Sequence, residues 1–305
     1  MKTTTSLIAV FGAGGFIGSA VDRAVRELPS WRGRAIKRQP GASPFAADIR
    51  DPAGVSAALT GADAVVHAAS YIGTDPALCD AINVEGARNV AQAARARGLR
   101  VTYVSTAAVY GREPYDFIRE ETRQVRPEST LSKSRATAEQ IILDHGGVII
   151  RPHLVVGAGD RWVGPGIAAL VQVIGGLVGG GSARHSVIEV DTLGHLVAEI
   201  ATAPSVPQST FHAAHNAPST ALNITTQMWP ELDEIASIHL HAAQALVSVT
   251  PSLSSALRLF SVDHVLDSEA ARSISTSPQL SSAFTLSSTA QTWYRQFRPL
   301  GRGHK

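Results

Sequence analysis

Residues 7–18 read LIAVFGAGGFIG, and this stretch decides the fold. Its first five residues form a short apolar run that is typical of a buried strand. Gly12, Gly15 and Gly18 then permit a tight turn, a close backbone approach to a pyrophosphate and close packing of a helix on the strand. A helix that begins at Phe16 would offer free backbone N–H groups to phosphates. The spacing is GxxGxxG rather than GxGxxG, but its place between a strand and a helix predicts a dinucleotide-binding loop.

Beyond this stretch, apolar runs alternate with Ala-rich helical patterns over the first two hundred residues. The alternation is typical of βαβ units and predicts an α/β fold with a doubly wound parallel sheet of the Rossmann type. Strands are expected at Ser6–Phe11, Gly33–Arg38, Ala64–Ala69, Val101–Ser105 and Val148–Arg151. Helices are expected at Phe16–Leu28, Pro52–Leu59, Pro76–Arg97 and Thr130–Asp144.

The pattern changes after Pro152, where a smaller C-terminal substrate-binding part is expected to begin. The dinucleotide-binding core is expected over 1–152, and a mixed region over 153–305. Within the mixed region, 186–214 is expected to return to the core, whereas 155–185 and 215–305 are expected to cover the substrate. The expected tail helices are Thr225–Val247, Asp263–Ile274 and Ser287–Gln296. The glycine-rich run 175–181 is interpreted either as the hinge of a lid or as a flexible loop.

Composition excludes several classes of protein. The 305 residues are 44% hydrophobic and 17% charged, which is too apolar for a disordered chain. The stretch 163–183 is interrupted by proline and glycines, and the N-terminal residues lack the apolar core of a signal peptide, so no membrane partner is expected. The arginines are scattered, which gives no sign of a nucleic-acid partner. We expect a cytoplasmic monomer or homodimer.

Metal binding is not expected from the sequence. Cys79 is the single cysteine, which excludes a cysteine-rich metal site and an internal disulfide. The eleven histidines show neither HxxxH nor HExxH spacing. His212 and His215 are interpreted as ordinary surface or core residues.

The end of the second strand distinguishes between the two nicotinamide dinucleotides. An acid there would hydrogen-bond the ribose 2′-OH, whereas a cation would accept a 2′-phosphate. The chain reads Ile36-Lys37-Arg38, without an acid. Arg38 can hold a phosphate through two hydrogen bonds, and Lys37 adds a second charge. We therefore expect NADPH, the alternative being that both side chains are solvated surface cations.

Further segments, in order along the chain, resemble the extended short-chain dehydrogenase/reductase family of the epimerase/dehydratase type. They are Asp48–Asp51, Val66–Ala69, Asn83–Asn89, Val104–Gly111, Arg151–His153 and Val190–Leu193. The resemblance covers residues 5–297 and, with the loop and strand end above, implies a cofactor site. Its expected members are Gly12, Gly15, Phe16, Ile17, Gly18, Lys37, Arg38, Asp48, Ile49, Ala68, Ala69, Ser70, Asn83, Arg135, Pro152 and His153. His153 is expected either to contact cofactor or substrate or to make a structural hydrogen bond.

The chain departs from the family at its proton-transfer motif, YxxxK. The register set by Ser134 and Glu139 places Leu131 at the tyrosine position and Arg135 at the lysine position. No YxxxK occurs anywhere in the chain. Two substitutes stay open: Ser129 with Lys133, which breaks the register, and Tyr115 with Arg119, expected in the loop before the helix.

The expected catalytic residues are Thr106, which aligns with the family's catalytic Ser/Thr, and its neighbour Ser105. Both hydroxyls can donate a hydrogen bond to a carbonyl oxygen as negative charge develops there. Losing a general acid typically costs about 10²–10⁴ in rate, which a reductase can survive if water or the substrate gives the proton. Alcohol oxidation would require a base, and neither Leu131 nor Arg135 supplies one.

The resemblance therefore favours an NADPH-dependent ketoreductase. Loss of both motif residues resembles the atypical ketoreductases of simocyclinone-type angucyclinone biosynthesis, whose substrates are large aromatic polyketide ketones in antibiotic biosynthesis. A small-molecule polycyclic ketone is thus the expected partner, with a neighbouring phenol as a possible proton source. The alternatives are a catalytically silent NADP(H)-binding redox regulator and a nucleotide-sugar epimerase or dehydratase.

Overall fold

The computed structural model describes residues 5–39, 45–232 and 235–299, and its centre is a six-stranded sheet. In spatial order the strands are β2 (Trp31–Ile36), β1 (Ser6–Phe11), β3 (Ala64–His67), β4 (Val101–Val104), β6 (Val148–Pro152) and β11 (Thr210–Ala213). All five neighbouring pairs are parallel. The chain passes from β1 outward to β2 and then returns to the other side of β1, so the strand order reverses beside β1. Open α/β sheets bind ligands at the carboxyl ends of strands next to such a reversal.

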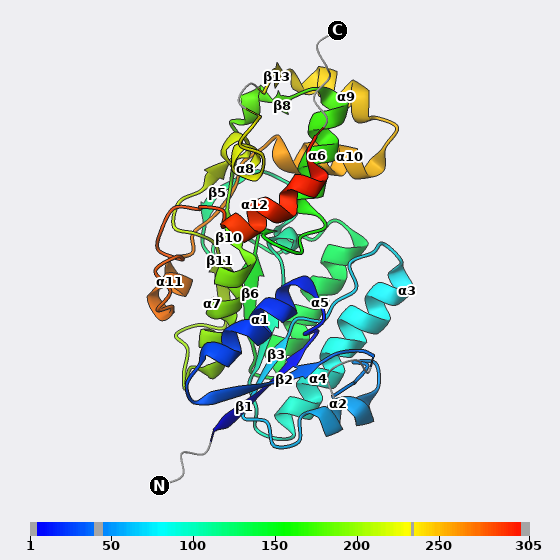
Figure 1. Ribbon diagram of the computed structural model, residues 1–305. Coiled ribbons are helices and arrows are strands. Elements are labelled where there is room, and N and C mark those ends of the chain that lie inside the picture. Colours follow the sequence, from blue (N-terminus) through cyan, green and yellow to red (C-terminus); the bar gives the residue numbers. More distant parts are fainter. Residues whose placement is uncertain (1–4, 40–44, 233–234, 300–305) are drawn as a thin grey trace.

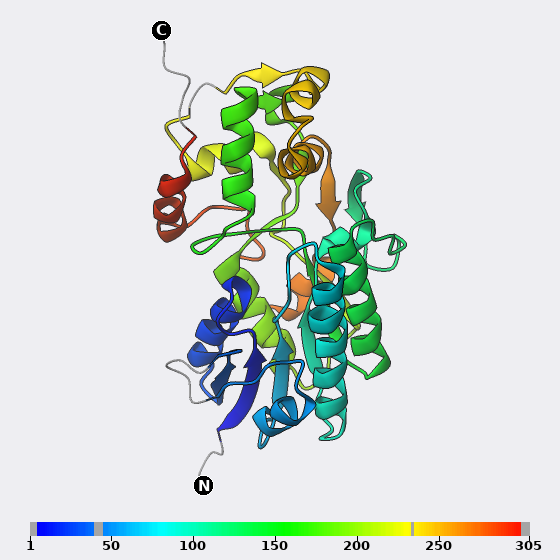
Figure 2. The same ribbon diagram turned by 90° about the vertical axis from the view of Figure 1, so that its right-hand side faces the viewer.

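Helices cover both faces of this sheet (Figure 1, Figure 2). One face carries α1 (Phe16–Glu27) and α7 (Val190–Thr202), and the other carries α2 (Pro52–Ala58), α4 (Glu85–Arg95) and α5 (Thr130–Asp144). Alternate residues of β1 point to opposite faces, so Ile8 joins the core under α1 whereas Ala9 joins the core under α4. The predicted doubly wound Rossmann fold is confirmed.

The predicted helix Pro76–Arg97 is not uniform. It begins as α3 (Pro76–Leu78), whose first N–H groups are capped by Asp75, and continues as a π-helical turn, η1 (Cys79–Val84), before α4. Single π turns inside helices often lie at functional sites. This one contains Asn83, a predicted cofactor residue.

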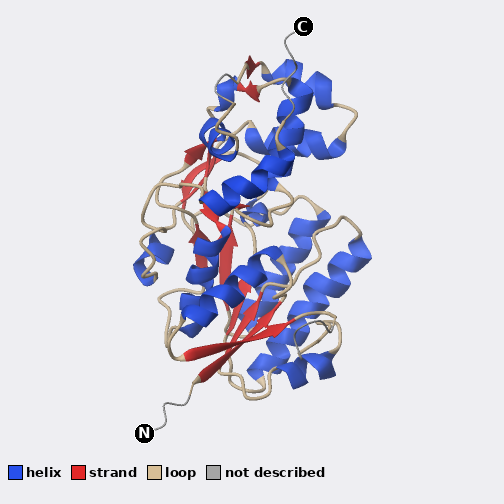
Figure 3. Ribbon diagram, viewed as in Figure 1, coloured by secondary structure: helices blue, strands red, loops and turns tan. Residues whose placement is uncertain are grey.

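The C-terminal part has a core of its own, above the sheet in Figure 3. Its helices are α6 (Val163–Ile174), α8 (Ala221–Met228), α9 (Leu240–Val247), α10 (Pro251–Phe260) and α12 (Ser288–Tyr294). A four-stranded sheet of β12 (Ser219–Thr220), β9 (Arg184–His185), β14 (His264–Leu266) and β5 (Tyr115–Ile118) connects the two parts. The other short elements are β7 (Leu154–Val156) with β10 (Val187–Glu189), β8 (Leu177–Val178) with β13 (Ser237–Ile238), α11 (Glu269–Ile274), η2 (Ala107–Tyr110), η3 (Gly179–Gly181) and η4 (Arg295–Phe297).

Two of the predicted tail helices are wrong in extent. The first was expected over Thr225–Val247, but α8 ends at Met228 because Pro230 disfavours helical geometry at Trp229, and α9 begins only at Leu240. The second was expected from Asp263, but His264–Leu266 form strand β14 instead, because they pair with β5. Tertiary pairing has overridden local helical pattern there.

The glycine-rich run 175–181, which was interpreted either as the hinge of a lid or as a flexible loop, follows a helix and contains regular structure. Residues 163–174 form helix α6 despite their glycines, and Gly175 ends it in the left-handed conformation with φ of 77°. Residues 177–178 then form β8, which pairs with β13. Within the described ranges, no helix combines the length and the apolar character that a membrane crossing requires.

Candidate functional site

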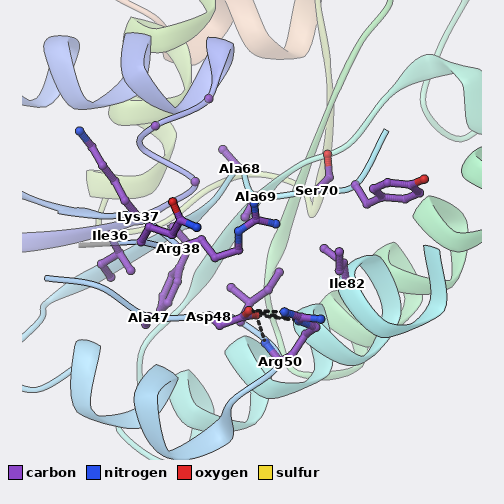
Figure 4. A pocket seen from close by; sticks show the side chains of 17 residues that line it. Ile36, Lys37, Arg38, Ala47, Asp48, Arg50, Ala68, Ala69, Ser70 and Ile82 are labelled. Carbon is purple, nitrogen blue, oxygen red and sulfur yellow. Dashed lines mark hydrogen bonds and ion pairs between the residues drawn. The ribbon is translucent and has the colours of Figure 1, made fainter. Parts of the chain in front are cut away.

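A pocket of about 500 Å³ opens at the carboxyl ends of β1, β2 and β3, beside the strand reversal (Figure 4). Nine predicted cofactor residues line it: Gly12, Gly15, Lys37, Arg38, Asp48, Ile49, Ala68, Ala69 and Ser70. Eight others line it that were not predicted: Phe11, Gly14, Ile36, Gln39, Ala47, Arg50, Tyr71 and Ile82. All eight adjoin a predicted residue in the sequence, so flanking positions were the missing signal.

The glycine loop, residues 12–18, contributes Gly12, Gly14 and Gly15 to the lining of this pocket. Gly12 has φ of 84°, and a Cβ on it would lie 2.5 Å from the backbone nitrogen of Ala69. Gly15 precedes α1 as its N-cap without a side-chain cap, and the first turn of α1 carries no acid. A Cβ on Gly18 would collide with the carbonyl of Gly12. The free N–H groups of the α1 N-terminus therefore remain available to an anion.

Phe16 and Ile17 begin α1, and both are partly buried rather than part of the pocket wall. Ile17 packs against the core beneath α1 and α7. Phe16 instead lies beside Gly159, where a Cβ would be 3.2 Å from its ring. The structure thus places these two at the start of the helix, facing neighbouring protein.

Positive charge gathers at the end of the pocket that lies beside the carboxyl end of β2 (Figure 4). Arg38 extends into the pocket, and Lys37 lies along the glycine loop, its Cδ 3.7 Å from where a Cβ on Gly14 would be (Figure 4). Arg50 pairs with Asp48 at 2.6 Å. The Arg50 hydrogen bonds lower the pKa of Asp48 to about 2, and the charge of Arg38 acts in the same direction. Asp48 therefore stays ionised at neutral pH, with Arg50 paired to it and Arg38 close enough to act on it.

Asn83 holds one wall of the pocket and does not line it. Its Oδ1 accepts from the backbone N of Tyr71 at 2.7 Å, and its Nδ2 donates to the Tyr71 carbonyl at 3.0 Å. The same Nδ2 donates to Ser134 Oγ at 2.9 Å. Asn83 therefore fixes the segment after β3 against α5, which makes it a positioning residue for Ser70 and Tyr71.

We expect Asn83→Ala to lower both stability and cofactor affinity. One buried and two partly buried hydrogen bonds disappear and leave polar groups unpaired, so the free energy of unfolding should fall by about 2 kcal/mol. Chemical denaturation and fluorescence titration with NADPH measure the two effects. Asn223→Ala, which removes a side-chain bond to Ser219 in the C-terminal part, is the matched control. A stability loss with unchanged NADPH affinity would show that Asn83 does not position the pocket.

Ser105 and Thr106 follow the carboxyl end of β4, as predicted for a catalytic pair. The Ser105 N–H donates to the Ile150 carbonyl at 2.7 Å, which ties it to β6, while its Oγ is buried without a hydrogen-bond partner in the described structure. Thr106 Oγ1 accepts from the backbone N of Ala108 at 3.1 Å. Its hydroxyl hydrogen stays available to another acceptor.

The two residues at the YxxxK positions lie on α5. Leu131 is in its first turn, and Arg135 is buried one turn later. Arg135 Nη2 donates to the carbonyl of Val104, and the guanidinium lies 5.0 Å from the ring centroid of Tyr103. Arg135 therefore anchors α5 to the end of β4, next to Ser105, and does not line the pocket described above.

The two proposed substitutes for the motif lie elsewhere. Ser129 caps α5 by accepting from the N–H of Ser132, and Lys133 is exposed. Tyr115 is not in a loop, as expected, but in strand β5, and burial raises its pKa well above the ordinary value. The Arg123 guanidinium lies 4.9 Å from its ring centroid. A buried tyrosine that holds its proton this firmly is a poor acid.

A buried polar network supports the end of β6. Arg151 pairs with Glu139 through two hydrogen bonds, at 2.6 and 3.0 Å, and also donates to the Tyr110 hydroxyl at 2.6 Å. That hydroxyl lies 2.6 Å from His212 Nε2. The network joins α5, η2 and β11 around β6, and so fixes the strand end that carries Pro152. Sequence reasoning had interpreted His212 as an ordinary surface or core residue and had not pointed to this network.

His153 follows Pro152, which is itself the last residue of β6. Its ring stands edge-on to Tyr115, with centroids 6.3 Å apart, and packs on two further histidines, His185 and His264. Burial, with the two neighbouring histidines, lowers the pKa of His153 well below its usual value. No spacing in the sequence pointed to this cluster, because its members come from three separate segments.

Comparison with known proteins supports the family assignment. The model of the NAD dependent epimerase/dehydratase family matches residues 8–217. A 2-alkyl-3-oxoalkanoate reductase of Shewanella oneidensis is 31% identical over 185 residues, which are 52% of this chain and 47% of that protein. A ceramide reductase of Caulobacter vibrioides is 29% identical over 50% of this chain and 48% of its own. The chain thus matches about half the length of these two relatives.

Solved structures agree in fold. The Bordetella bronchiseptica enzyme WbmH in complex with NAD⁺ superimposes with a TM-score of 0.71 at 19% identity, covering 96% of this chain and 99% of that one. RMD from Pseudomonas aeruginosa, complexed with NADPH, superimposes with a TM-score of 0.61 at 17% identity, covering 84% of this chain and 98% of that one. The resemblance to extended short-chain dehydrogenases/reductases is thereby confirmed, and the chain belongs to the NAD dependent epimerase/dehydratase family.

Proposed function

We propose that the chain is an NADPH-dependent ketoreductase. The observation that carries the proposal is the charge at the end of the pocket beside β2: Lys37 and Arg38 line it, and its one nearby carboxylate, Asp48, is already paired with Arg50. This surface suits a 2′-phosphate and offers no free acid for a ribose 2′-OH. Two relatives whose names describe reductases point the same way.

The direction of the reaction follows from what α5 lacks. Alcohol oxidation needs a base to remove the hydroxyl proton, whereas Leu131 is apolar and the guanidinium of Arg135 has no acceptor atom that could take it. Carbonyl reduction needs hydrogen-bond donors for the developing alkoxide, which Ser105 and Thr106 offer. The hydride would come from NADPH, and the proton from water or the substrate.

For the substrate we propose a large aromatic polyketide ketone, as in angucyclinone-type antibiotic biosynthesis. The chain resembles the atypical ketoreductases that lack both the tyrosine and the lysine of the motif, and this resemblance supports the substrate class. Trp162, 63% exposed just before α6, offers an aromatic contact within the 155–185 segment that would cover the substrate. An apolar aromatic ligand gains free energy from such contacts.

The test is NADPH oxidation in the presence of a phenolic polycyclic ketone, with isolation of the alcohol. Turnover with stoichiometric alcohol would support the proposal. Tight NADPH binding without turnover on any such ketone would instead favour a silent redox regulator.

A nucleotide-sugar epimerase is the second candidate, because two solved structures of this fold are UDP-glucose 4-epimerases. An epimerase would first oxidise its sugar and then return the hydride, with no net change in cofactor. Incubation with UDP-glucose and oxidised cofactor distinguishes the epimerase from the ketoreductase. Because the base is missing, we expect no epimerised sugar nucleotide.

We expect the wild type to bind NADPH at least about tenfold more tightly than NADH, a difference of roughly 1.4 kcal/mol. Arg38→Ala should narrow this gap to a few-fold by weakening NADPH binding alone, because Arg38 faces the 2′-phosphate. Fluorescence titration of the wild type and of Arg38→Ala with NADPH and with NADH measures the ratio of the two affinities. Arg95→Ala removes the same charge at the end of α4, away from the pocket, and should leave the ratio unchanged. Equal wild-type affinities would contradict the NADPH assignment.

A further inference from the structure

Three histidines from distant parts of the chain meet where the sheet joins the C-terminal part. His153 lies between β6 and β7, His185 ends β9 and His264 begins β14. His185 and His264 are directly paired on parallel neighbouring strands, and His264 is also paired with Tyr115 on β5. Residues that are level on adjacent strands project from the same face, so three side chains in a row face His153.

The rings are close and buried. The His153 ring stacks on that of His185, with centroids 5.8 Å apart at 16°, and lies 5.1 Å from that of His264. His185 is 0% exposed and His264 is 3% exposed. One ring nitrogen of each histidine lies within 4.8 Å of the others.

Four ring nitrogens of this cluster have no hydrogen-bond partner in the described structure: His153 Nε2, both nitrogens of His185 and His264 Nδ1. Outside the cluster, His212 is anchored, since its Nδ1 lies 3.0 Å from the Asp267 carbonyl and its Nε2 lies 2.6 Å from the Tyr110 hydroxyl, whereas both ring nitrogens of the buried His67 also have no partner in the described structure. Buried nitrogens without partners are costly, because they have lost water and gained nothing in return. A shared ligand would satisfy several of them at once.

We propose that His153, His185 and His264 bind a divalent transition metal ion, zinc by preference. Three imidazoles around one ion, with a fourth position left open, form a common zinc donor set. Tetrahedral zinc with Zn–N bonds of about 2.0–2.1 Å places its ligand nitrogens about 3.4 Å apart. The three ring nitrogens, which now lie within 4.8 Å of one another, must therefore move closer when the ion binds.

The chemistry of the donors restricts the choice of ion. The three-histidine group contains neither carboxylate nor thiolate, so it suits zinc, copper or nickel and not calcium or magnesium. Neutral imidazole is the form that binds metal, and burial keeps these rings neutral: the pKa of His185 is lowered to about 3. Protons should therefore compete weakly with the ion even in mild acid.

The charges around the cluster are mixed. Burial lowers the pKa of His185, and the negative charge of the Asp263 carboxylate opposes part of that lowering. Asp263 is itself paired with Arg184 at 2.6 Å. On the other side, Arg123 lowers the pKa of His264 and lies over the Tyr115 ring. The binding energy must therefore come from the imidazole bonds themselves.

The test uses tag-free protein, stripped with chelator and then loaded with zinc, with elemental analysis after gel filtration. We expect close to one zinc per chain, and a visible absorption band of tetrahedral cobalt(II) when cobalt replaces zinc. His185→Gln and His264→Gln should each weaken zinc binding by roughly a hundredfold in competition with a chromogenic chelator. His215→Gln is the matched control, because His215 is also buried with an unpartnered Nε2 but lies outside the cluster.

Zinc should also raise the melting temperature of the wild type and of His215→Gln, but not that of the cluster variants. Far-UV circular dichroism and NADPH binding check that the variants fold; if they do not, the wild-type stoichiometry and cobalt spectrum decide. Traces of zinc with no cobalt band in the wild type, or binding that survives both cluster substitutions, would overturn the proposal. None of these readouts depends on ketone turnover.

Discussion

Gly12→Ala is expected to weaken dinucleotide binding at least a hundredfold, about 2.7 kcal/mol, in a chain that still folds. Gly12 has φ of 84°, which L side chains rarely adopt, and a Cβ there would lie 2.5 Å from the nitrogen and 2.7 Å from the Cα of Ala69. Both contacts are with backbone, so the loop and the segment after β3 must separate. That separation deforms the pocket at the point where the pyrophosphate approaches.

Gly61→Ala is the matched control for this substitution. Gly61 also has a positive φ, 70°, but a Cβ there would meet no atom within 4 Å. It should therefore cost only the left-handed conformation, about 1 kcal/mol of stability, with unchanged cofactor affinity. Calorimetric titration with NADPH, beside thermal unfolding of each variant, separates the two effects. Wild-type affinity in a folded Gly12→Ala protein would mean that the pyrophosphate lies elsewhere.

Local sequence predicted the Rossmann part well because its signals are local. The run Ser6–Phe11 was placed at its observed bounds, and helix Thr130–Asp144 likewise, since apolar periodicity and caps lie within each segment. Seven of the nine predicted pocket residues follow the ends of β1, β2 and β3, the other two being Asp48 and Ile49. In a parallel sheet those ends meet at one edge, so topology alone brings the seven together.

The C-terminal part was predicted less well because its signals are not local. His264–Leu266 look helical in isolation but become a strand beside Tyr115–Ile118, far away in the sequence. The histidine cluster depends on that same pairing and on the path of the chain after Pro152. Asn83 was placed correctly in a helical segment, yet its bonds to Tyr71 needed the three-dimensional structure to be seen.

Methylating the phenol beside the reacting carbonyl is expected to slow hydride transfer by about 10²–10⁴, the usual value of a general acid. The reason is that the two YxxxK positions offer no general acid: Leu131 has no proton to give, and the Arg135 guanidinium is a poor proton source that donates to the Val104 carbonyl. Single-turnover oxidation of bound NADPH, followed by stopped-flow with the phenol and its methyl ether, measures the ratio. Equal affinities of the two ketones are the necessary control.

Two substitutions test whether a side chain elsewhere in the chain acts as the general acid in place of the missing motif tyrosine. Tyr115→Phe should stay within a few-fold of wild type, because burial raises the pKa of that hydroxyl while the ring contacts to His153 and His264 survive its removal. Lys133→Met should behave likewise, since Lys133 is exposed on α5. A roughly thousandfold slower turnover in either variant, with NADPH still bound, would identify a relocated acid and contradict substrate assistance. Equal rates for phenol and ether, with both variants active, would contradict substrate assistance and favour water as the proton source.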